Sequence, residues 1–487
     1  MMKLWKSSGK YRIVFLGLLY GLTRLLNLTG LPIFNDEAIY LDWGVRMWNY
    51  HEPFLSLYDG KPPLLMWVFG TVVNIFTDPL LAGRLVSVVA GGLTLTGIYV
   101  LSKELYDDKI ALAASAIYCL APLFVFFDRQ ALMESAIAAM GVWTLILTLR
   151  LIKNPSFAPA FGLAMLWAGG IWIKTNAVVF VMASMLLMTT KKDKKVVLGY
   201  GAFALGLMLI MLLPLVAQKD AIKILDLNSR FSLSIGEILK LPVDTWLGNL
   251  RSVIEIGWWQ VGLLMWLPVL KWVYKSKKST ADKRMLLWVG TLILVYAALS
   301  KVANPRYLVS FLPILAILMA RATDVKKSVN KIALVASLGV FVVFDGLLVA
   351  APVKYFEVLE KVTVYSQARN YLTGFASGYG VKPAIDYVIQ EIGPKDALVG
   401  IRLDAGNPES AVSLYMSKHT NIQTVYFDER SVELPKENDI NLSVPMYYVA
   451  RDENFAGVER FLILEKKFDK PDGSNVGIYR VRSELNN

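Results

Sequence analysis

Residues 196–217 read VVLGYGAFALGLMLIMLLPLVA and contain no charged side chain. A transmembrane helix needs roughly 20 mostly apolar residues to cross about 30 Å of hydrocarbon, so this stretch predicts a membrane span. Similar stretches bring the predicted number of spans to about eleven. They lie at 13–31, 81–101, 110–127, 131–151, 157–173, 176–190, 196–217, 257–274, 285–301, 306–320 and 331–352.

The composition agrees with a polytopic α-helical membrane protein. Of the 487 residues, 55% are hydrophobic and 18% are charged, whereas soluble proteins have roughly 45–50% apolar and about 25% charged residues. This balance argues against a soluble enzyme and excludes a disordered chain. A single cysteine (Cys119) and two histidines exclude a disulfide framework and a Cys/His-rich metal site.

The net charge of +12 is explained by where the basic residues lie. Basic clusters precede the first predicted span and separate later ones; they comprise Lys3, Lys6, Lys10 and Arg12, then Lys191, Lys192, Lys194 and Lys195, then Lys271, Lys275, Lys277, Lys278, Lys283 and Arg284, and finally Arg321, Lys326, Lys327 and Lys331. The positive-inside rule places all of them in the cytoplasm if the N-terminus is cytoplasmic. We therefore expect a multi-pass plasma-membrane protein that has an extracytoplasmic C-terminus and does not bind nucleic acid.

The chain divides into two predicted domains. Residues 1–352 form the transmembrane domain, with outer loops at 32–80 and 218–255. Residues 353–487 have the composition of a small extracytoplasmic α/β domain. In this domain we expect an amphipathic helix at 381–392 and strands at 397–402, 422–427, 445–450, 459–465 and 476–481.

The first outer loop carries two adjacent carboxylates. Asp36 and Glu37 open a segment in which apolar residues recur at helical spacing, which predicts an amphipathic helix lying in the membrane interface. Carboxylates at a helix N-terminus can serve simply as a cap that favours the helix dipole. The spacing alone leaves open whether Asp36 and Glu37 are such caps or functional groups.

Further ionisable groups interrupt the apolar pattern at the predicted outer ends of spans, where they are costly unless they are paired or used. They are Lys61 before Pro62-Pro63-Leu64, Asp128 and Arg129 followed by Glu134, Lys174 before Thr175-Asn176, and Arg306-Tyr307 after Asn304-Pro305. Each has a structural alternative: a helix start for Lys61, an ion pair for Arg129 and Glu134, and snorkelling for Lys174. By the predicted topology, however, all of these groups face one membrane surface.

A surface that joins carboxylates to several cations suits one kind of chemistry well. The cations bind a phosphate or diphosphate, and a carboxylate removes a proton from an attacking hydroxyl group.

These motifs resemble the GT-C membrane glycosyltransferases over about residues 1–350. The similar branch is glycosyltransferase family 39, which includes the protein O-mannosyltransferases and the aminoarabinose transferases that modify lipid A. The resemblance rests on Asp36-Glu37 after the first span, Lys61-Pro62-Pro63-Leu64, Arg129 with Glu134, Lys174, and Arg306-Tyr307 before Pro313. The single motifs are weak, but their order and their common side are more specific.

The resemblance implies an enzyme that moves a sugar from a polyprenyl-phosphate donor to a hydroxyl group of a protein, lipid or glycan on the outer face of the membrane, with inversion. It implies that Asp36 is the general base and that Glu37 orients the acceptor or, in some relatives, a divalent metal. It also implies that the donor phosphate is bound by Lys61, Arg129, Lys174, Arg306 and Tyr307, with Glu134 and Asp128 in support. No cofactor is certain, and a divalent metal bound by Asp36 and Glu37 is left open.

Some features depart from the family pattern or leave alternatives. Glu134 stands where Asp is more usual, and Lys174 is followed by Thr175 and not by glycine. The stretch from Gly374 to Gly380 is either a loop that folds over the site or a flexible link. A transporter or flippase of lipid-linked saccharides would place charges through the midplane and often show repeats, which we do not find. A large outer loop between late spans would favour an O-antigen-type ligase or polymerase, but in this chain the large loop comes first and a C-terminal domain follows the spans.

Overall fold

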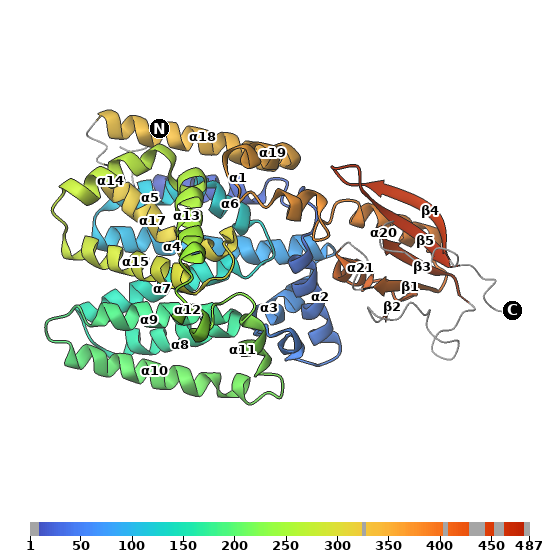
Figure 1. Ribbon diagram of the computed structural model, residues 1–487, viewed down its shortest axis with the longest axis horizontal. Coiled ribbons are helices and arrows are strands. Elements are labelled where there is room, and N and C mark those ends of the chain that lie inside the picture. Colours follow the sequence, from blue (N-terminus) through green and yellow to red (C-terminus); the bar gives the residue numbers. More distant parts are fainter. Residues whose placement is uncertain (1–8, 324–327, 403–407, 428–443, 452–461, 482–487) are drawn as a thin grey trace.

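The computed structural model describes residues 9–323, 328–402, 408–427, 444–451 and 462–481. A helical bundle occupies one end of the longest axis and a sheet domain the other, with α2 (Asn35–Asn49) between them (Figure 1). Four residues of the predicted basic clusters, Lys3, Lys6, Lys326 and Lys327, lie outside the described residues.

Each predicted span contains helix. The helices of the bundle are α1 (Gly9–Leu25), α4 (Pro79–Leu105), α5 (Asp108–Leu120), α6 (Pro122–Asp128), α7 (Glu134–Lys153), α8 (Phe157–Ile173), α9 (Val178–Met188), α10 (Lys195–Val216), α13 (Val243–Gly257), α14 (Trp266–Lys275), α15 (Thr280–Leu299), α16 (Pro305–Val309), α17 (Pro313–Ala322), α18 (Ser328–Ala350) and α19 (Pro352–Val362). Short 3₁₀ or π turns join some of them, namely η3 (Thr175–Ala177), η4 (Trp258–Gly262) and η5 (Leu263–Met265).

The predicted number of about eleven spans is not confirmed. Among the described residues, five helical segments are long and apolar enough to cross a membrane, or six if the bent pair α5–α6 is one span. Shorter apolar helices account for other predicted spans, among them α8 and α17. One of the five segments runs from Val243 to Lys275, so the predicted outer loop 218–255 is shorter than expected. Its first part contains α11 (Lys223–Asn228) and α12 (Ile235–Leu239).

Proline explains two places where a predicted span is broken. α5 and α6 are bent by 63°, and Ala121 between them is extended because it precedes Pro122. The predicted span 306–320 is likewise divided into α16 and α17, with Pro313 at the first position of α17. Proline is tolerated there because the first helical N–H has no intrahelical partner.

The first outer loop folds as predicted into a helix with Asp36 and Glu37 in its first turn. This helix, α2, crosses α3 (Leu64–Val73), and the two are joined by η2 (Leu55–Asp59). The crossing requires glycine on both sides: a Cβ on Gly44 would lie 2.7 Å from the Gly70 main-chain nitrogen, and one on Gly70 would lie 2.2 Å from the Gly44 carbonyl oxygen. The close packing fixes the direction in which the first turn of α2 points.

The C-terminal domain confirms much of the predicted element order. α20 (Val381–Ile392), β1 (Ala397–Arg402) and β2 (Ile422–Phe427) have the predicted bounds, and β3 (Met446–Ala450) and β5 (Asn475–Val481) differ by one residue at one end. β4 (Leu462–Asp469) begins later than predicted, and residues 459–461 lie outside the described residues. The sheet order is β2-β1-β3-β5-β4.

The sheet is mixed, and its helices also connect it to the bundle. β1 runs parallel to β2 and β3, whereas β5 runs antiparallel to β3 and β4. α20 and α21 (Glu409–Met416) pack against each other and against the sheet, and α21 also packs on α2. Lys418, just after α21, donates to the main-chain carbonyls of Val73 and Phe76 beside α3. The domain is therefore docked on α2 and on the end of α3, which both lie in the predicted outer loop 32–80.

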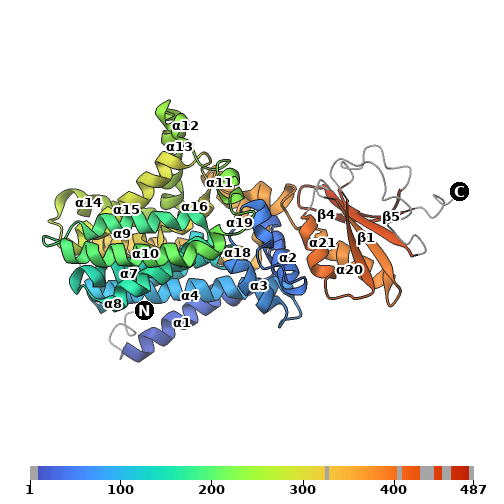
Figure 2. The same cartoon turned by 90° about the horizontal axis from the view of Figure 1, so that it is seen from below.

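The described basic clusters lie away from this domain. The connection between α9 and α10, with Lys191 to Lys195, is at the end of the bundle opposite the sheet (Figures 1 and 2). The connection between α14 and α15 lies at the same end. This separation of charge along the bundle agrees with the predicted sidedness of the loops.

Candidate active site

Four of the predicted site residues meet where α2, α7 and α16 begin and α8 ends. Glu134 is the first residue of α7, and its Oε1 accepts from Lys174 Nζ at 2.9 Å and from Arg306 Nε at 3.2 Å. Arg306 Nη1 also donates to Asp36 Oδ2 at 2.5 Å. We call Asp36, Glu134, Lys174 and Arg306 the charged cluster. Its residues come from positions up to 270 apart in the sequence.

Burial within the charged cluster is graded. The Glu134 side chain is fully buried, whereas 31% of Asp36 is exposed. One oxygen of Glu134, Oε1, accepts from both cations. The other oxygen, Oε2, has no hydrogen-bond partner among the described residues. Asp36 is the carboxylate that a bound molecule can reach. The cluster has two acids and two bases, so each ion is compensated inside a largely apolar protein.

Local structure holds the cations in place. Asn304 caps α16 by accepting the Arg306 main-chain N–H at 3.0 Å, which fixes the start of this helix. The Tyr307 ring lies 5.3 Å from Lys174 Nζ, within the range of a cation–π contact. Tyr307 therefore contacts a cation of the cluster, and its predicted contact with the donor phosphate stays a prediction. Burial lowers the pKa of Lys174, while the neighbouring Glu134 carboxylate opposes this shift.

Within the part of the chain that the structure describes, Lys61 forms no ion pair with the charged cluster. Its Nζ pairs with Asp59 Oδ2 at 3.5 Å and lies 6.0 Å from the Phe231 ring. The side chain is partly exposed. The structure thus leaves Lys61 available to a ligand, and its predicted contact with the donor phosphate stays a prediction.

Glu37, the second acid of the pair, points away from the charged cluster. Arg84 donates to it twice, through Nε at 2.8 Å and Nη2 at 2.7 Å, and both side chains are fully buried. The main-chain N–H groups of Phe34 and Ala131 donate to the same carboxylate at 2.9 and 2.6 Å. Both Glu37 oxygens are engaged in holding α2 against α4 and the turn before α7. This arrangement does not support its predicted catalytic role.

The same contacts bear on the metal that the sequence left open. With both Glu37 oxygens bound by Arg84 and the main chain, Asp36 is the one acid of the pair that could take a ligand. Within the described residues no group of three or more His, Cys, Asp or Glu side chains could hold a metal ion. The residues at this point therefore do not fit a divalent metal held by Asp36 and Glu37.

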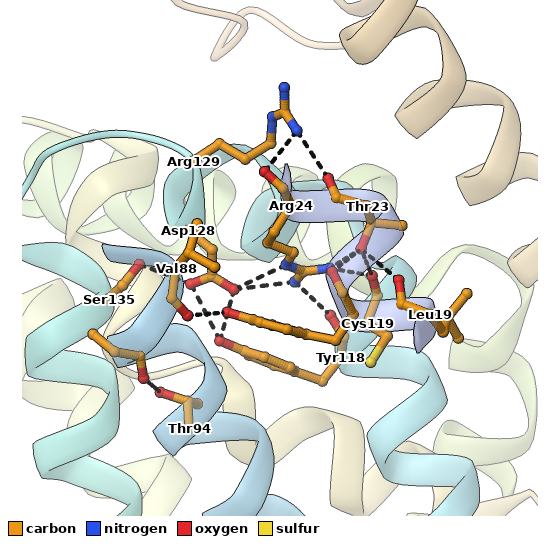
Figure 3. Close-up of polar contacts among 12 residues, drawn as sticks. Leu19, Thr23, Arg24, Val88, Thr94, Tyr118, Cys119, Asp128, Arg129 and Ser135 are labelled. Carbon is orange, nitrogen blue, oxygen red and sulfur yellow. Dashed lines mark hydrogen bonds and ion pairs between the residues drawn. The ribbon is translucent and has the colours of Figure 1, made fainter. Parts of the chain in front are cut away.

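Asp128 belongs to a second buried network inside the bundle. Figure 3 shows Asp128 between Arg24, Tyr118 and Ser135. Arg24 Nη2 donates to Asp128 Oδ2 at 3.1 Å, the Tyr118 hydroxyl donates to it at 3.0 Å, and Ser135 Oγ donates to Oδ1 at 2.7 Å. Asp128 therefore ties α6 to α1 and to α7, and any support for the charged cluster is indirect, through the start of α7.

Arg129 is also placed outside the charged cluster. Its guanidinium donates to the main-chain carbonyls at the end of α1, as Figure 3 shows in part. The distances to the oxygens of Thr23, Arg24, Leu26 and Asn27 are 2.8–3.1 Å. A cation at a helix C-terminus satisfies carbonyls that have no intrahelical partner. Its predicted phosphate contact gains no support from this arrangement.

Two arginines escaped the sequence analysis, Arg24 and Arg84. Each is a single charge within a predicted apolar span, and a charge there is costly unless it has a partner. That rule was applied only to the ends of spans. Applied to the interior, it would have predicted two buried acids as partners. The structure identifies them as Asp128 and Glu37.

The Glu37–Arg84 pair yields a prediction about stability. Arg84→Ala would leave the buried Glu37 carboxylate without its counter-ion, and we expect a loss of about 3–5 kcal/mol in the free energy of unfolding. Thermal denaturation of the detergent-solubilised protein measures this loss. The matched control is Arg150→Ala, which breaks an exposed pair with Glu104 and should cost about 0–1 kcal/mol. Equal effects of the two substitutions would contradict the assigned structural role.

Comparisons with known proteins agree with the resemblance seen in the sequence. Residues 60–217 match the sequence model of the family described as dolichyl-phosphate-mannose-protein mannosyltransferase. This region contains Lys61, Glu134 and Lys174 but neither Asp36 nor Arg306. No curated protein sequence matches the chain.

Solved structures match over nearly the whole chain. ArnT from Cupriavidus metallidurans in the apo state aligns with a TM-score of 0.60 and 14% identity, covering 97% of this chain and 98% of ArnT. ArnT bound to undecaprenyl phosphate gives 0.55 and 13%, with coverage of 96% and 97%. The Archaeoglobus fulgidus oligosaccharyltransferase in complex with zinc and sulfate gives 0.50 and 12%, covering 96% of this chain and 72% of that one.

These matches confirm the predicted resemblance to GT-C membrane glycosyltransferases. The chain has the fold of ArnT, with apolar helices followed by a small sheet domain.

Proposed function

We propose that this protein is a membrane glycosyltransferase that moves a sugar from a polyprenyl-phosphate donor to a hydroxyl group of an acceptor. The observation that carries the proposal is the charged cluster, which joins a partly exposed carboxylate to two cations at one end of a GT-C fold. The general chemistry of glycosyl transfer to a hydroxyl group needs these two kinds of group: a base for the acceptor and cations for the leaving phosphate.

The donor phosphate is proposed to bind at Arg306 and Lys174. Both cations are held by the buried Glu134, so they are fixed in place before a ligand arrives. Fixed cations stabilise charge that develops in the transition state without a cost of reorganisation. A protein of the same fold, ArnT, has been solved with undecaprenyl phosphate bound, which supports a lipid phosphate as the leaving group.

Asp36 is proposed to act as the general base. In this structure its carboxylate is paired with Arg306, and a donor phosphate bound to Arg306 would compete for the same guanidinium. Donor binding would thereby free Asp36 to accept the acceptor proton. The acceptor oxygen then bonds to the anomeric carbon, the bond from that carbon to the phosphate oxygen breaks, and the bonding electrons leave with the phosphate. Direct displacement of this kind inverts the anomeric centre.

The reaction is proposed to take place on the outer face of the plasma membrane, with the N-terminus in the cytoplasm. Support comes from charge: Asp36 of the charged cluster belongs to α2, which packs on α21 of the sheet domain, and the described basic clusters are at the opposite end of the bundle. The positive-inside rule assigns that opposite end to the cytoplasm. The acceptor is proposed to be a protein, lipid or glycan hydroxyl group that approaches between the sheet domain and the membrane.

Transfer assays with defined donors test this proposal. Membranes containing the chain would be incubated with a panel of purified polyprenyl-phosphate sugars, and we expect release of polyprenyl phosphate and labelling of an acceptor with at least one of them. Membranes containing the Asp36→Asn variant are the control and should show neither. Turnover of a polyprenyl-diphosphate sugar with no turnover of any monophosphate donor would contradict the proposed donor class.

A further inference from the structure

A segment that follows the last bundle helix crosses the candidate site. Residues 363–378, which we call the strap, connect α19 to α20 and include the short helix η6 (Arg369–Thr373). The strap runs between the bundle and the sheet domain (Figure 1). It begins on α13, where Thr363 Oγ1 donates to Glu255 Oε2 at 3.2 Å.

The strap contacts the residue that fixes Arg306. Gln367 Nε2 donates to Asn304 Oδ1 at 2.8 Å, and the same oxygen accepts the Arg306 main-chain N–H at 3.0 Å. Gln367 therefore holds the amide of Asn304 in the orientation that caps α16. A change in this amide would move the start of the helix from which the Arg306 side chain reaches Asp36 and Glu134.

Farther along, the strap contacts the residues directly before Asp36. The Ala376 carbonyl accepts the Asn35 main-chain N–H at 3.0 Å, and Ser377 forms an antiparallel bridge with Phe34. The Tyr371 ring stacks on Phe34 with 4.6 Å between ring centroids. The strap thus binds both sequence neighbours that precede the proposed base.

The approach is close, and the far end of the strap is anchored in the sheet domain. A Cβ on Gly378 would lie 2.1 Å from the Ile33 carbonyl oxygen, so glycine is required at this contact. Lys470, which follows β4 and is buried, donates to the carbonyls of Gly374 and Ser377 at 3.3 and 3.1 Å. The Gly-rich stretch is therefore a packed segment beside α2, and these contacts do not support a flexible link.

Gln367 carries backbone strain at the centre of these contacts. Its φ is 58°, in the left-handed region that favours glycine. Residues held in such conformations persist when the surrounding structure over-determines them, and they cluster at functional sites. Here the strained residue is the one whose side chain reaches Asn304.

We infer that the strap holds Asp36 and Arg306 in fixed positions relative to each other. We also infer that Gln367 is a positioning residue for sugar transfer. The inference rests on the proposed function, and it assigns the sheet domain a role in the reaction. The strap joins that domain, through Lys470, to both partners of the Asp36–Arg306 pair. The domain thereby sets the geometry of the site from outside the bundle.

Gln367→Gly tests the inference because it should lower kcat without lowering the melting temperature. Glycine removes the hydrogen bond to Asn304 and relieves the left-handed strain, so the melting temperature should stay the same or rise. A misplaced catalytic group slows the reaction strongly, and we expect kcat to fall about 10-fold with the donor KM nearly unchanged. His51→Gly is the matched control: His51 has a φ of 56°, is exposed and follows α2 at the end far from Asp36.

The possible outcomes separate this inference from the proposed function. Unchanged kcat in Gln367→Gly, or a fall in kcat that follows a fall in melting temperature, would overturn the positioning role. If the wild-type protein transfers no sugar, the proposed function fails. The positioning role of the strap is then tested by hydrogen exchange. Faster exchange in Gln367→Gly than in His51→Gly for peptides covering 35–40 and 305–310 would support the strap, and equal exchange would overturn it.

Discussion

Asp36→Asn is expected to abolish sugar transfer, with a fall in kcat of about 10³-fold. A positioned base typically contributes about 10²–10⁴-fold to a reaction, and an asparagine amide cannot accept the acceptor proton. The substitution keeps the shape of the side chain, and its remaining oxygen can still accept from Arg306. Because Asp36 is partly exposed, the variant should fold and insert into membranes like the wild type. Initial rates with saturating donor and acceptor measure the effect.

The control for this substitution is Glu52→Gln, which removes one negative charge from the predicted outer loop 32–80 that also contains Asp36. Glu52 lies in the exposed turn after α2, away from the charged cluster. Its loss should leave transfer unchanged, which separates a change in surface charge from the loss of a base. Full activity in Asp36→Asn would show that the base has been assigned to the wrong residue.

Arg306→Ala is expected to lower kcat/KM for the donor by about 10³-fold, because a fixed donor to developing charge is worth about 10²–10³-fold in rate and binding is lost as well. Of the two cations in the charged cluster, Arg306 pairs with both acids, whereas Lys174 pairs with Glu134. Glu134 would keep Lys174 as its partner, so the fold should survive. Arg306→Lys should recover little, since an ammonium group is a point charge without the planar fork of arginine.

Separate titrations of donor and acceptor make this prediction specific. The acceptor KM should change much less than kcat/KM for the donor. Arg480→Ala is the matched control, because Arg480 is an exposed arginine that pairs with Glu465 in the sheet domain; its loss should change neither value. A large change in acceptor KM with normal donor use would mean that the phosphate binds elsewhere.

The two carboxylates at the start of α2 show where the sequence stops being informative. Spacing alone could not separate Asp36 from Glu37, and only the family resemblance assigned the base to Asp36. Successive residues on an α-helix point about 100° apart, since a turn contains 3.6 residues. Only the packing of α2 against α3 and α4 decides that Glu37 turns inward to Arg84 and Asp36 turns towards Arg306.

Local sequence was sufficient where a short-range pattern determines the outcome. Hydropathy located the helices of the bundle because apolar stretches must be helical in lipid to satisfy their backbone groups. An amphipathic helical pattern located α20, and short strand-like runs located β1 and β2, to the residue. Pro122 and Pro313 were not interpreted as breaks in the predicted spans, although they account for the places where the structure divides two of them.

The sequence by itself determined that this chain has an apolar helical domain with a small sheet domain after it, and that acids and bases gather at the ends of its helices. The spacing of apolar residues, the positions of charged residues and the residues that favour turns are local features, so they can be recognised from neighbouring residues. Which acid meets which base was decided by the tertiary structure alone, because the partners are distant in sequence. Asp36 and Arg306 are 270 residues apart, and the strap that contacts both of their helices begins beyond the last bundle helix.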